Sequence, residues 1–329
     1  MSTRLTSFSK ILIVLVVMVV LFFLFRKFIP QNEPKSADSS EIKTEVAKEN
    51  SESVNNTKTS SNNIFTYKPT KPINGKLKGV VELGASGFNS FIVKMDHNKN
   101  WELKKAEWGN SLVYDNMATS GDIREGLKRY ITKILDYGVD GRDIHFVVSS
   151  GAQKVGSTKR IISELRNMNY VVNTVTPEQE AKYALTAVLP KKYKTVAFVV
   201  DIGSGNTKIS WVKDNGAIKG LETYGAKYYK KKINDKTVYQ DVFNKSKMIP
   251  KNRTKICFMI GGVPFKLAKE VRKGKERYTV LKAPEDYNVE GAKMESGINI
   301  YKAIRDATGC DLYVFDWDAN FTIGFLLGL

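Results

Sequence analysis

The sequence predicts an α/β fold of two domains with a ligand cleft between them, preceded by one transmembrane helix and a disordered linker. Two segments, 79–94 and 197–212, share one order: an apolar strand, an acidic residue, a turn of small residues and a second strand. They begin about 120 residues apart, a separation that suits one small domain for each copy. A long apolar run near the N-terminus, followed by a polar stretch, predicts the membrane anchor and the linker.

The two turns have the composition of phosphate-binding loops. Glu82 precedes the small-residue run 84–87, and Asp201 precedes the run 203–205. Glycine adopts positive φ angles without steric cost, so backbone N–H groups can close around an anion. The acidic residue at each strand end can hold a metal ion beside the bound phosphate. The alternative is two ordinary β-hairpins whose acidic side chains accept hydrogen bonds from turn amides.

Composition narrows the chemistry that this chain of 329 residues can perform. It has two cysteines, Cys257 and Cys310, and two histidines, His97 and His145. These numbers argue against a disulfide framework, a His-based zinc site and a Ser-His-Asp triad. Cys257 lies in an apolar run and is expected in the core. Catalysis would therefore depend on carboxylates, backbone amides, Lys or Arg side chains and a divalent cation.

The formal net charge of +18 suits a partner with many negative charges. One stretch is especially rich in basic residues: Lys227, Lys230, Lys231, Lys232, Lys236, Lys245, Lys247, Lys251, Arg253 and Lys255. One interpretation is a lysine-rich surface that serves solubility. The other is attraction to polyphosphate, a nucleotide, nucleic acid or an anionic membrane. Four tyrosines between residues 224 and 239 would allow base stacking, although we rank nucleic acid below the other partners.

An apolar run at residues 11–25 predicts a membrane anchor. Extended to residue 29, it approaches the length needed to span a bilayer, and basic residues flank it on both sides. A cleaved signal peptide is the alternative, but no small-residue cleavage site follows the run closely. We therefore expect an uncleaved, single-pass anchor within residues 1–29. The flanking charges slightly favour the cytoplasmic side for the rest of the chain.

A polar stretch separates this anchor from the globular part. Residues 30–63 are rich in Ser, Asn, Glu, Lys and Thr and lack a periodic apolar pattern. Such a composition cannot bury enough apolar surface to fold. We assign residues 30–75 to a disordered linker.

Residues 76–190 are expected to form the first domain, with the element order βββαβαβα. We expect strands at 79–83, 88–95 and 100–106, a helix at 119–136, a strand at 143–149, a helix around 161–165, a strand at 170–173 and a helix at 177–188. The first helix carries apolar residues at helical spacing: Ile123, Leu127, Ile131 and Leu135. The last begins with Thr176 as its N-cap and Pro177 at its first position.

Residues 191–329 are expected to form the second domain, which repeats the opening of the first. We expect strands at 196–201, 207–213 and 217–223, a partly helical basic segment at 226–250, a buried strand from 255, a helix that begins at Pro264, a helix near 292–307, a strand at 312–315 and an apolar, buried helix at 319–329. Gly261 and Gly262 form a third glycine turn, which lets a flat base or a ribose approach the backbone.

These three turns resemble those of the superfold shared by actin, sugar kinases and heat-shock chaperones. Within it, residues from about 77 to 329 resemble the exopolyphosphatase / guanosine pentaphosphate phosphohydrolase (Ppx/GppA) family. The segment 82–88 stands where the family has Asp-Leu-Gly-Ser-Asn-Ser-Phe, and 201–208 where it has Asp-Ile-Gly-Gly-Gly-Ser-Thr-Glu. Residues 176–182 match the family's Ser-Gly-x-Glu-Glu-Ala-Arg helix start. The resemblance implies two ribonuclease-H-like (actin-like ATPase) α/β domains.

The resemblance also implies the roles of the site residues in an in-line transfer of phosphate to water. Glu180 occupies the position of the general base, while Asp201 and Glu82 occupy the metal position, with Mg²⁺ or Mn²⁺ as cofactor. Gly261 and Gly262 loosely match the nucleotide-binding turn. The implied phosphate-binding residues are Gly84, Ala85, Ser86, Gly203, Ser204, Gly205, Asn206, Thr207, Lys154 and Lys208. The alternative role of Glu180 is to stabilise the N-terminus of its own helix.

Several loop residues depart from the family pattern. Glu82 replaces an Asp, and Ala85 and Ser86 replace a Ser-Asn pair. Lys154 stands near a position where the family has Arg, whose planar, bidentate grip on phosphate a Lys cannot give. Lys208 replaces a Glu and reverses the charge beside the metal position. One hypothesis is that Lys208 contacts phosphate and replaces the charge of the metal.

Three functions follow from the sequence. The first is a membrane-anchored phosphohydrolase that releases terminal phosphate from polyphosphate or a guanosine polyphosphate, with a homodimer as the usual assembly in such a family. The second is a catalytically weak or inactive module at the membrane that binds nucleotide or polyanion or serves as a scaffold, and the altered loops favour it. The third is a polymer-forming ATPase, against which the tether argues.

Overall fold

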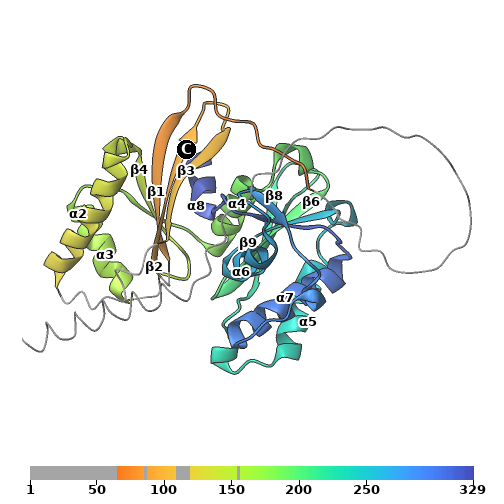
Figure 1. Ribbon diagram of the computed structural model, residues 1–329. Helices are drawn as coiled ribbons and strands as arrows, with labels where there is room; N and C mark the ends of the chain where they lie inside the picture. The colour runs from red at the N-terminus through yellow and green to blue at the C-terminus, as the bar shows by residue number, and fades with distance from the viewer. Residues whose placement is uncertain (1–64, 85–86, 109–118, 154–155) are drawn as a thin grey trace, which may run out of the picture. The chain divides into compact units, whose positions relative to one another are not determined.

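The computed structural model describes residues 65–84, 87–108, 119–153 and 156–329, which contain two mixed β-sheets (Figure 1). The described residues belong to one compact unit that spans residues 60–329. Within them, no helix combines the length and the apolarity that crossing a membrane requires. The anchor expected at residues 1–29 and most of the expected linker lie outside the described residues.

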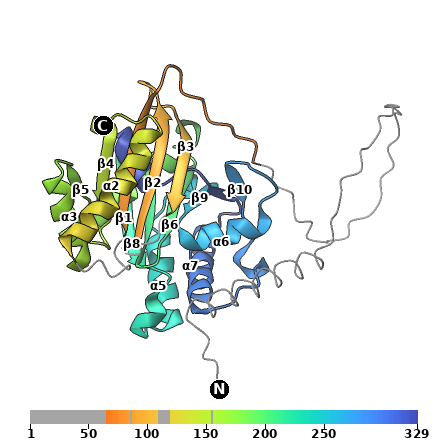
Figure 2. The same ribbon diagram turned by 60° about the vertical axis from the view of Figure 1, so that its left-hand side comes forward.

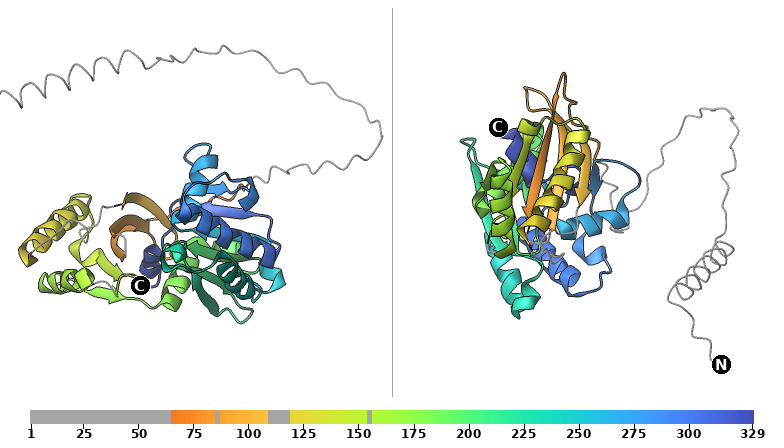
Figure 3. Two further views of the ribbon diagram at one scale, coloured as in Figure 1. Left: turned by 90° about the horizontal axis from the view of Figure 1, so that it is seen from below. Right: turned by 90° about the vertical axis from the view of Figure 1, so that its left-hand side faces the viewer.

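The first sheet has the strand order β3-β2-β1-β4-β5. Its strands are β1 (Lys76–Gly84), β2 (Gly87–Met95), β3 (Trp101–Trp108), β4 (Ile144–Val148) and β5 (Val172–Thr174). The first three form an antiparallel meander, and β1, β4 and β5 pair in parallel. Helices α2 (Ser120–Asp136) and α3 (Gly156–Asn167) pack against it through one apolar cluster, and Figure 3 shows both together beside the first-sheet strands. With α4 (Pro177–Val188), the predicted order βββαβαβα is confirmed.

One predicted core position in α2 is wrong. Ile123, Leu127 and Ile131 are buried as expected, but Leu135 is 41% exposed and Ile134 takes its place. The α-helix turns every 3.6 residues, so three consecutive steps of four rotate a side chain away from the core. A step of three residues after two steps of four, from Ile131 to Ile134, turns the side chain toward the core again.

The second sheet has the order β10-β11-β9-β6-β7-β8. Its strands are β6 (Ala197–Ile202), β7 (Asn206–Val212), β8 (Ile218–Tyr224), β9 (Ile256–Ile260), β10 (Tyr278–Val280) and β11 (Tyr313–Asp316). Helices α5 (Asp235–Ser246), α6 (Gly262–Val271) and α7 (Ala292–Thr308) share an apolar cluster with it, and Figure 2 shows α6 and α7 beside its strands. Helix α6 begins two residues before Pro264, because proline is tolerated within the first turn, where its missing N–H lacks an intrahelical partner anyway.

Two helices pack between the sheets. Helix α4 and the last helix, α8 (Phe321–Leu327), lie near the centre of Figure 1. They belong to one apolar cluster with residues of both sheets, such as Val80 and Phe91 of the first and Val199 and Phe258 of the second. The expectation that the terminal apolar helix is buried is therefore confirmed. Because α4 carries Glu180 in its first turn, this packing places that carboxylate beside both sheets.

The start of α4 is held by a capping box. The Thr176 hydroxyl accepts a hydrogen bond from Gln179 N at 3.2 Å, and the Gln179 side chain accepts one from Thr176 N at 2.9 Å. Thr176→Ala is expected to lower the free energy of unfolding by about 1 kcal/mol, because the hydroxyl that accepts from Gln179 N is lost. Denaturant unfolding measures this change in the free energy of unfolding. Thr186→Ala, on an exposed face of the same helix, is the control. An equal loss in both variants would contradict the capping role.

Candidate functional site

Glu180 is buried and charge-paired. It is 1% exposed. One carboxylate oxygen, Oε1, accepts a hydrogen bond from Ser150 N at 2.7 Å, and Oε2 accepts one from Ser150 Oγ at 3.0 Å. The Nζ of Lys208 lies 2.5 Å from Oε2. A buried carboxylate is stable only with such partners, so Ser150 at the end of β4 and Lys208 on β7 define its position.

Glu82 faces the same region from β1. Its Oε2 accepts hydrogen bonds from the side-chain amides of Asn89 (3.0 Å) and Asn320 (3.1 Å). Asn89 is the cross-strand neighbour of Glu82, and Asn320 is the N-cap of α8. Burial raises the pKa of Glu82, and the negative charges of Glu180 and Asp201 add to the rise although both amides oppose it. The three carboxyl groups therefore act on one another.

Asp201 and Lys208 complete this group as cross-strand partners on β6 and β7. Burial raises the pKa of Asp201, while the positive charge of Lys208 opposes the rise. Lys208 is 8% exposed. Burial alone would lower its pKa, but Asp201 and Glu180 outweigh burial and raise the pKa of the ammonium group. We name Glu82, Glu180, Asp201 and Lys208 the acid–lysine cluster.

The second glycine turn presents free backbone donors beside this cluster. Gly203 N donates to Asn206 O at 3.1 Å, which closes the turn. Two carbonyls of the turn, those of Gly203 and Ser204, accept from backbone N–H groups of residues 226 and 227. Within the described part of the chain, the N–H groups of Ser204 and Gly205 have no hydrogen-bond acceptor. Successive free N–H groups in a turn form a site suited to an anion.

Other predicted phosphate-binding residues point elsewhere. The Asn206 side chain donates to Glu222 Oε1 at 2.6 Å. Thr207 is fully buried, and among the described residues its hydroxyl has no partner. Strand alternation puts it on the face of β7 opposite Lys208. Gly84 ends β1 opposite Gly87. Ala85, Ser86 and Lys154 lie outside the described residues.

The third glycine turn lies directly against Asp201. Gly261 has φ of +101°, and a Cβ added there would lie 2.6 Å from Asp201 Oδ1, so the backbone approaches closely only because this residue is glycine. A Cβ on Gly262 would lie 3.7 Å from Lys293 Nζ. Burial lowers the pKa of Lys293, and the positive charges of Lys227 and Lys266 lower it further. Three lysines thus gather beside the second and third turns.

The solved structures that resemble this chain include exopolyphosphatases. A Ppx/GppA family member from Aquifex aeolicus has a TM-score of 0.57 at 17% identity, with 77% of this chain and 97% of that chain covered. An exopolyphosphatase from Cytophaga hutchinsonii ATCC 33406 has a TM-score of 0.59 at 13% identity, with 76% and 96% covered. The chain has the Ppx/GppA fold. The comparisons with family models and with curated proteins found no match. At such identities the likeness establishes the fold, and function must be argued from the site.

The resemblance of the sequence to the Ppx/GppA family implies a divalent cation at Asp201 and Glu82. This cation stays a prediction. The described residues contain no group of three or more His, Cys, Asp or Glu side chains arranged to hold a metal ion. Glu82 Oε2 accepts two amide hydrogen bonds, a Cβ on Gly261 would lie 2.6 Å from Asp201 Oδ1, and Lys208 interacts with all three carboxylates. These residues, as they stand, do not fit a divalent cation.

Sequence reasoning missed three residues of this site: Ser150, Asn89 and Asn320. Each follows from a local signal. Ser150 is the second residue after the buried strand β4, where side chains of α/β sheets meet ligands. Asn89 lies in the first hairpin opposite the acid, and Asn320 precedes an apolar helix as an N-cap. What the sequence does not tell is that their side chains converge on Glu82 and Glu180.

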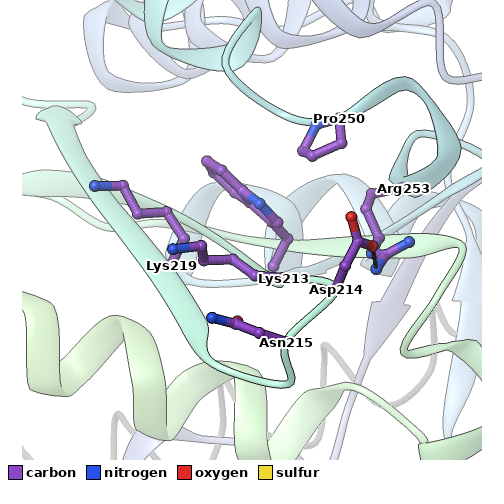
Figure 4. Close-up of a pocket in the computed structure, with 7 residues that line it drawn as sticks. Lys213, Asp214, Asn215, Lys219, Pro250 and Arg253 are labelled. Atoms are coloured by element: carbon purple, nitrogen blue, oxygen red, sulfur yellow. Dashed lines mark hydrogen bonds and ion pairs between the residues drawn. The ribbon is translucent and has the colours of Figure 1, made fainter.

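A separate hollow of about 500 Å³ lies at the other end of β7, beside the β7–β8 turn (Figure 4). Trp211, Lys213, Asp214, Asn215, Lys219, Pro250 and Arg253 line it. The Arg253 guanidinium donates to Val212 O, Thr195 O and Asp214 Oδ1. Because this buried cation is already satisfied, it serves to hold the turn in place.

Proposed function

We propose that this protein is a phosphohydrolase that releases terminal phosphate from a condensed phosphate, either polyphosphate or a guanosine polyphosphate. The observation that supports it most is the meeting of Glu180, on helix α4, with Lys208 and Asp201, on two strands of the second sheet, beside the free N–H groups of the second glycine turn. A base, a cation and anion-binding amides in one place are the parts that phosphoryl transfer to water requires. The Ppx/GppA fold is consistent with this chemistry.

The reaction uses Glu180 as the general base. When a phosphate enters, the ammonium of Lys208 pairs with a phosphate oxygen instead of Glu180. Oε2 of Glu180 is then free to accept a hydrogen bond from a water molecule. The water oxygen forms a bond to the terminal phosphorus as the bridging P–O bond breaks, and a proton of the water passes to Glu180. The bridging oxygen keeps the bonding electrons and leaves with the rest of the substrate. The N–H groups of Ser204 and Gly205 stabilise the charge on the phosphoryl oxygens.

The lysines beside the third turn favour a substrate with several phosphates. Within the described chain, no carboxylate pairs with Lys227, Lys266 or Lys293. Lys293, whose pKa burial and these two neighbouring charges lower, gains from a ligand with several negative charges. A chain of phosphates that begins at the acid–lysine cluster would reach them. We also propose that residues 1–29 anchor the protein, with the enzyme on the cytoplasmic side as a homodimer.

Phosphate release tests this proposal. The full chain in detergent micelles is supplied with long-chain polyphosphate, guanosine pentaphosphate or ATP, each with EDTA and with Mg²⁺ or Mn²⁺. Glu180→Gln is expected to lower kcat about a hundredfold, because the base is lost. Lys208→Met, which breaks the same ion pair and keeps the base, is expected to raise KM instead. Both variants are assayed where circular dichroism shows them folded.

A second candidate is a tethered binding module without catalysis. The observation that favours it is that both oxygens of Glu180 already have partners. Binding of tripolyphosphate without release from any of the three substrates would establish this module and reject the hydrolase. Release at an equal rate by the parent chain and Glu180→Gln would also reject Glu180 as the base.

A further inference from the structure

We infer that Lys208 takes the place of a divalent cation, so that this site binds condensed phosphate without a metal ion. The inference rests on the phosphate-binding part of the proposed function and is independent of whether hydrolysis follows. It concerns the site of the acid–lysine cluster and the second glycine turn. Its basis is where the positive charge lies and which donors remain for an anion.

The ammonium of Lys208 stands among three carboxylates. It is 8% exposed, pairs with Glu180 at 2.5 Å, and interacts electrostatically with Asp201 and Glu82. An ammonium group has three N–H donors, so two remain after the bond to Glu180. A buried cation with remaining donors provides an anion with positive charge and directed contacts, as a metal ion does.

The same arrangement opposes a divalent cation. Mg²⁺ requires near-octahedral oxygen ligands, and here one candidate oxygen, Glu82 Oε2, already accepts two hydrogen bonds. The two amides are those of Asn89 and Asn320, and the backbone of Gly261 lies so near Asp201 that an added Cβ would be 2.6 Å from its Oδ1. A divalent ion among these carboxylates would also meet the fixed positive charge of Lys208, and the repulsion is strong in a site shielded from water.

The ligand of this centre is the phosphoryl oxygen of a condensed phosphate. Lys208 supplies a point charge, and the N–H groups of Ser204 and Gly205 supply directed donors. Inorganic polyphosphate and the phosphate chain of a nucleotide share this chemistry. Titration with inorganic tripolyphosphate and with guanosine pentaphosphate therefore separates the two sources, since added affinity for the latter would mean that the nucleoside is also recognised.

Isothermal titration calorimetry on the full chain in micelles tests the inference. Mn²⁺ is the metal probe and inorganic tripolyphosphate, in EDTA, is the anion probe. The parent chain is expected to bind tripolyphosphate in EDTA and to show no Mn²⁺ site. Lys208→Met is expected to weaken tripolyphosphate binding at least about tenfold, because a charge-assisted contact is lost. Lys302→Met, on an exposed face of α7, makes the same charge change and is expected to bind as the parent does.

Lys208→Glu provides the reverse test. It restores the acid that the family pattern has here, and it is expected to gain a Mn²⁺ site and to bind tripolyphosphate only when Mn²⁺ is present. A single Mn²⁺ site in the parent chain, together with loss of tripolyphosphate binding in EDTA, would overturn the inference even if both variants fail to fold. Tripolyphosphate binding that requires Mg²⁺ would overturn the inference and leave the hydrolase intact. Binding in EDTA without hydrolysis would support the inference and reject the hydrolase.

Discussion

Glu180→Gln is expected to lower the free energy of unfolding by about 3–5 kcal/mol at neutral pH. The substitution keeps the volume of the side chain and removes its charge, so buried Lys208 loses its ion-pair partner and keeps only the charges of Asp201 and Glu82. A buried unpaired ammonium is much less stable than an exposed one. Urea unfolding followed by circular dichroism measures the loss.

A double-mutant cycle shows whether the loss comes from this pair. Adding Lys208→Met to Glu180→Gln removes the unpaired charge, so the double variant is expected to lose less than the two single variants together. The coupling energy is expected to be about 2 kcal/mol. Strict additivity would mean that the two side chains are not paired in the folded protein. It would also remove the basis for a substrate-driven exchange of Lys208 between Glu180 and phosphate.

Gly324→Ala is expected to lower the free energy of unfolding by roughly 3 kcal/mol or more. A Cβ at this position of α8 would lie 1.8 Å from Tyr183 O and 2.6 Å from Tyr183 C, both backbone atoms of α4. Backbone cannot move aside like a flexible side chain, so the two helices must separate between the sheets. Thermal and urea unfolding both report the loss.

Gly156→Ala is the matched control, because a Cβ at the start of α3 meets nothing within 4 Å. A helical position with space favours alanine, so this variant is expected to be as stable as the parent or slightly more stable. Gly324→Ala is further expected to weaken tripolyphosphate binding, since α8 carries Asn320 to Glu82. Equal stability of the two variants would show that α4 and α8 do not approach as closely as the structure indicates.

Local patterns in the sequence predict most of the elements. Apolar alternation and helical spacing give the order of strands and helices in the first half and most of it in the second, where the short strand β10 was not predicted. Thr176 and Pro177 mark the start of α4 through capping chemistry that involves only near neighbours. The limits of this reasoning appear at Leu135, where one residue of rotation decides which side chain is buried.

The features of the site also divide into those that the sequence predicts and those that depend on tertiary packing. The sequence by itself determined that acids stand beside glycine turns, because strand, acid and turn are local features that each segment carries alone. Only the tertiary structure decided their partners. Asn320 reaches Glu82 from 238 residues away, and Lys208 reaches Glu180 of helix α4 from a strand of the second sheet. Such contacts depend on how α4 and α8 pack between the two sheets. The charge that Lys208 brings is visible in the sequence, but its burial among three carboxylates follows only from this packing.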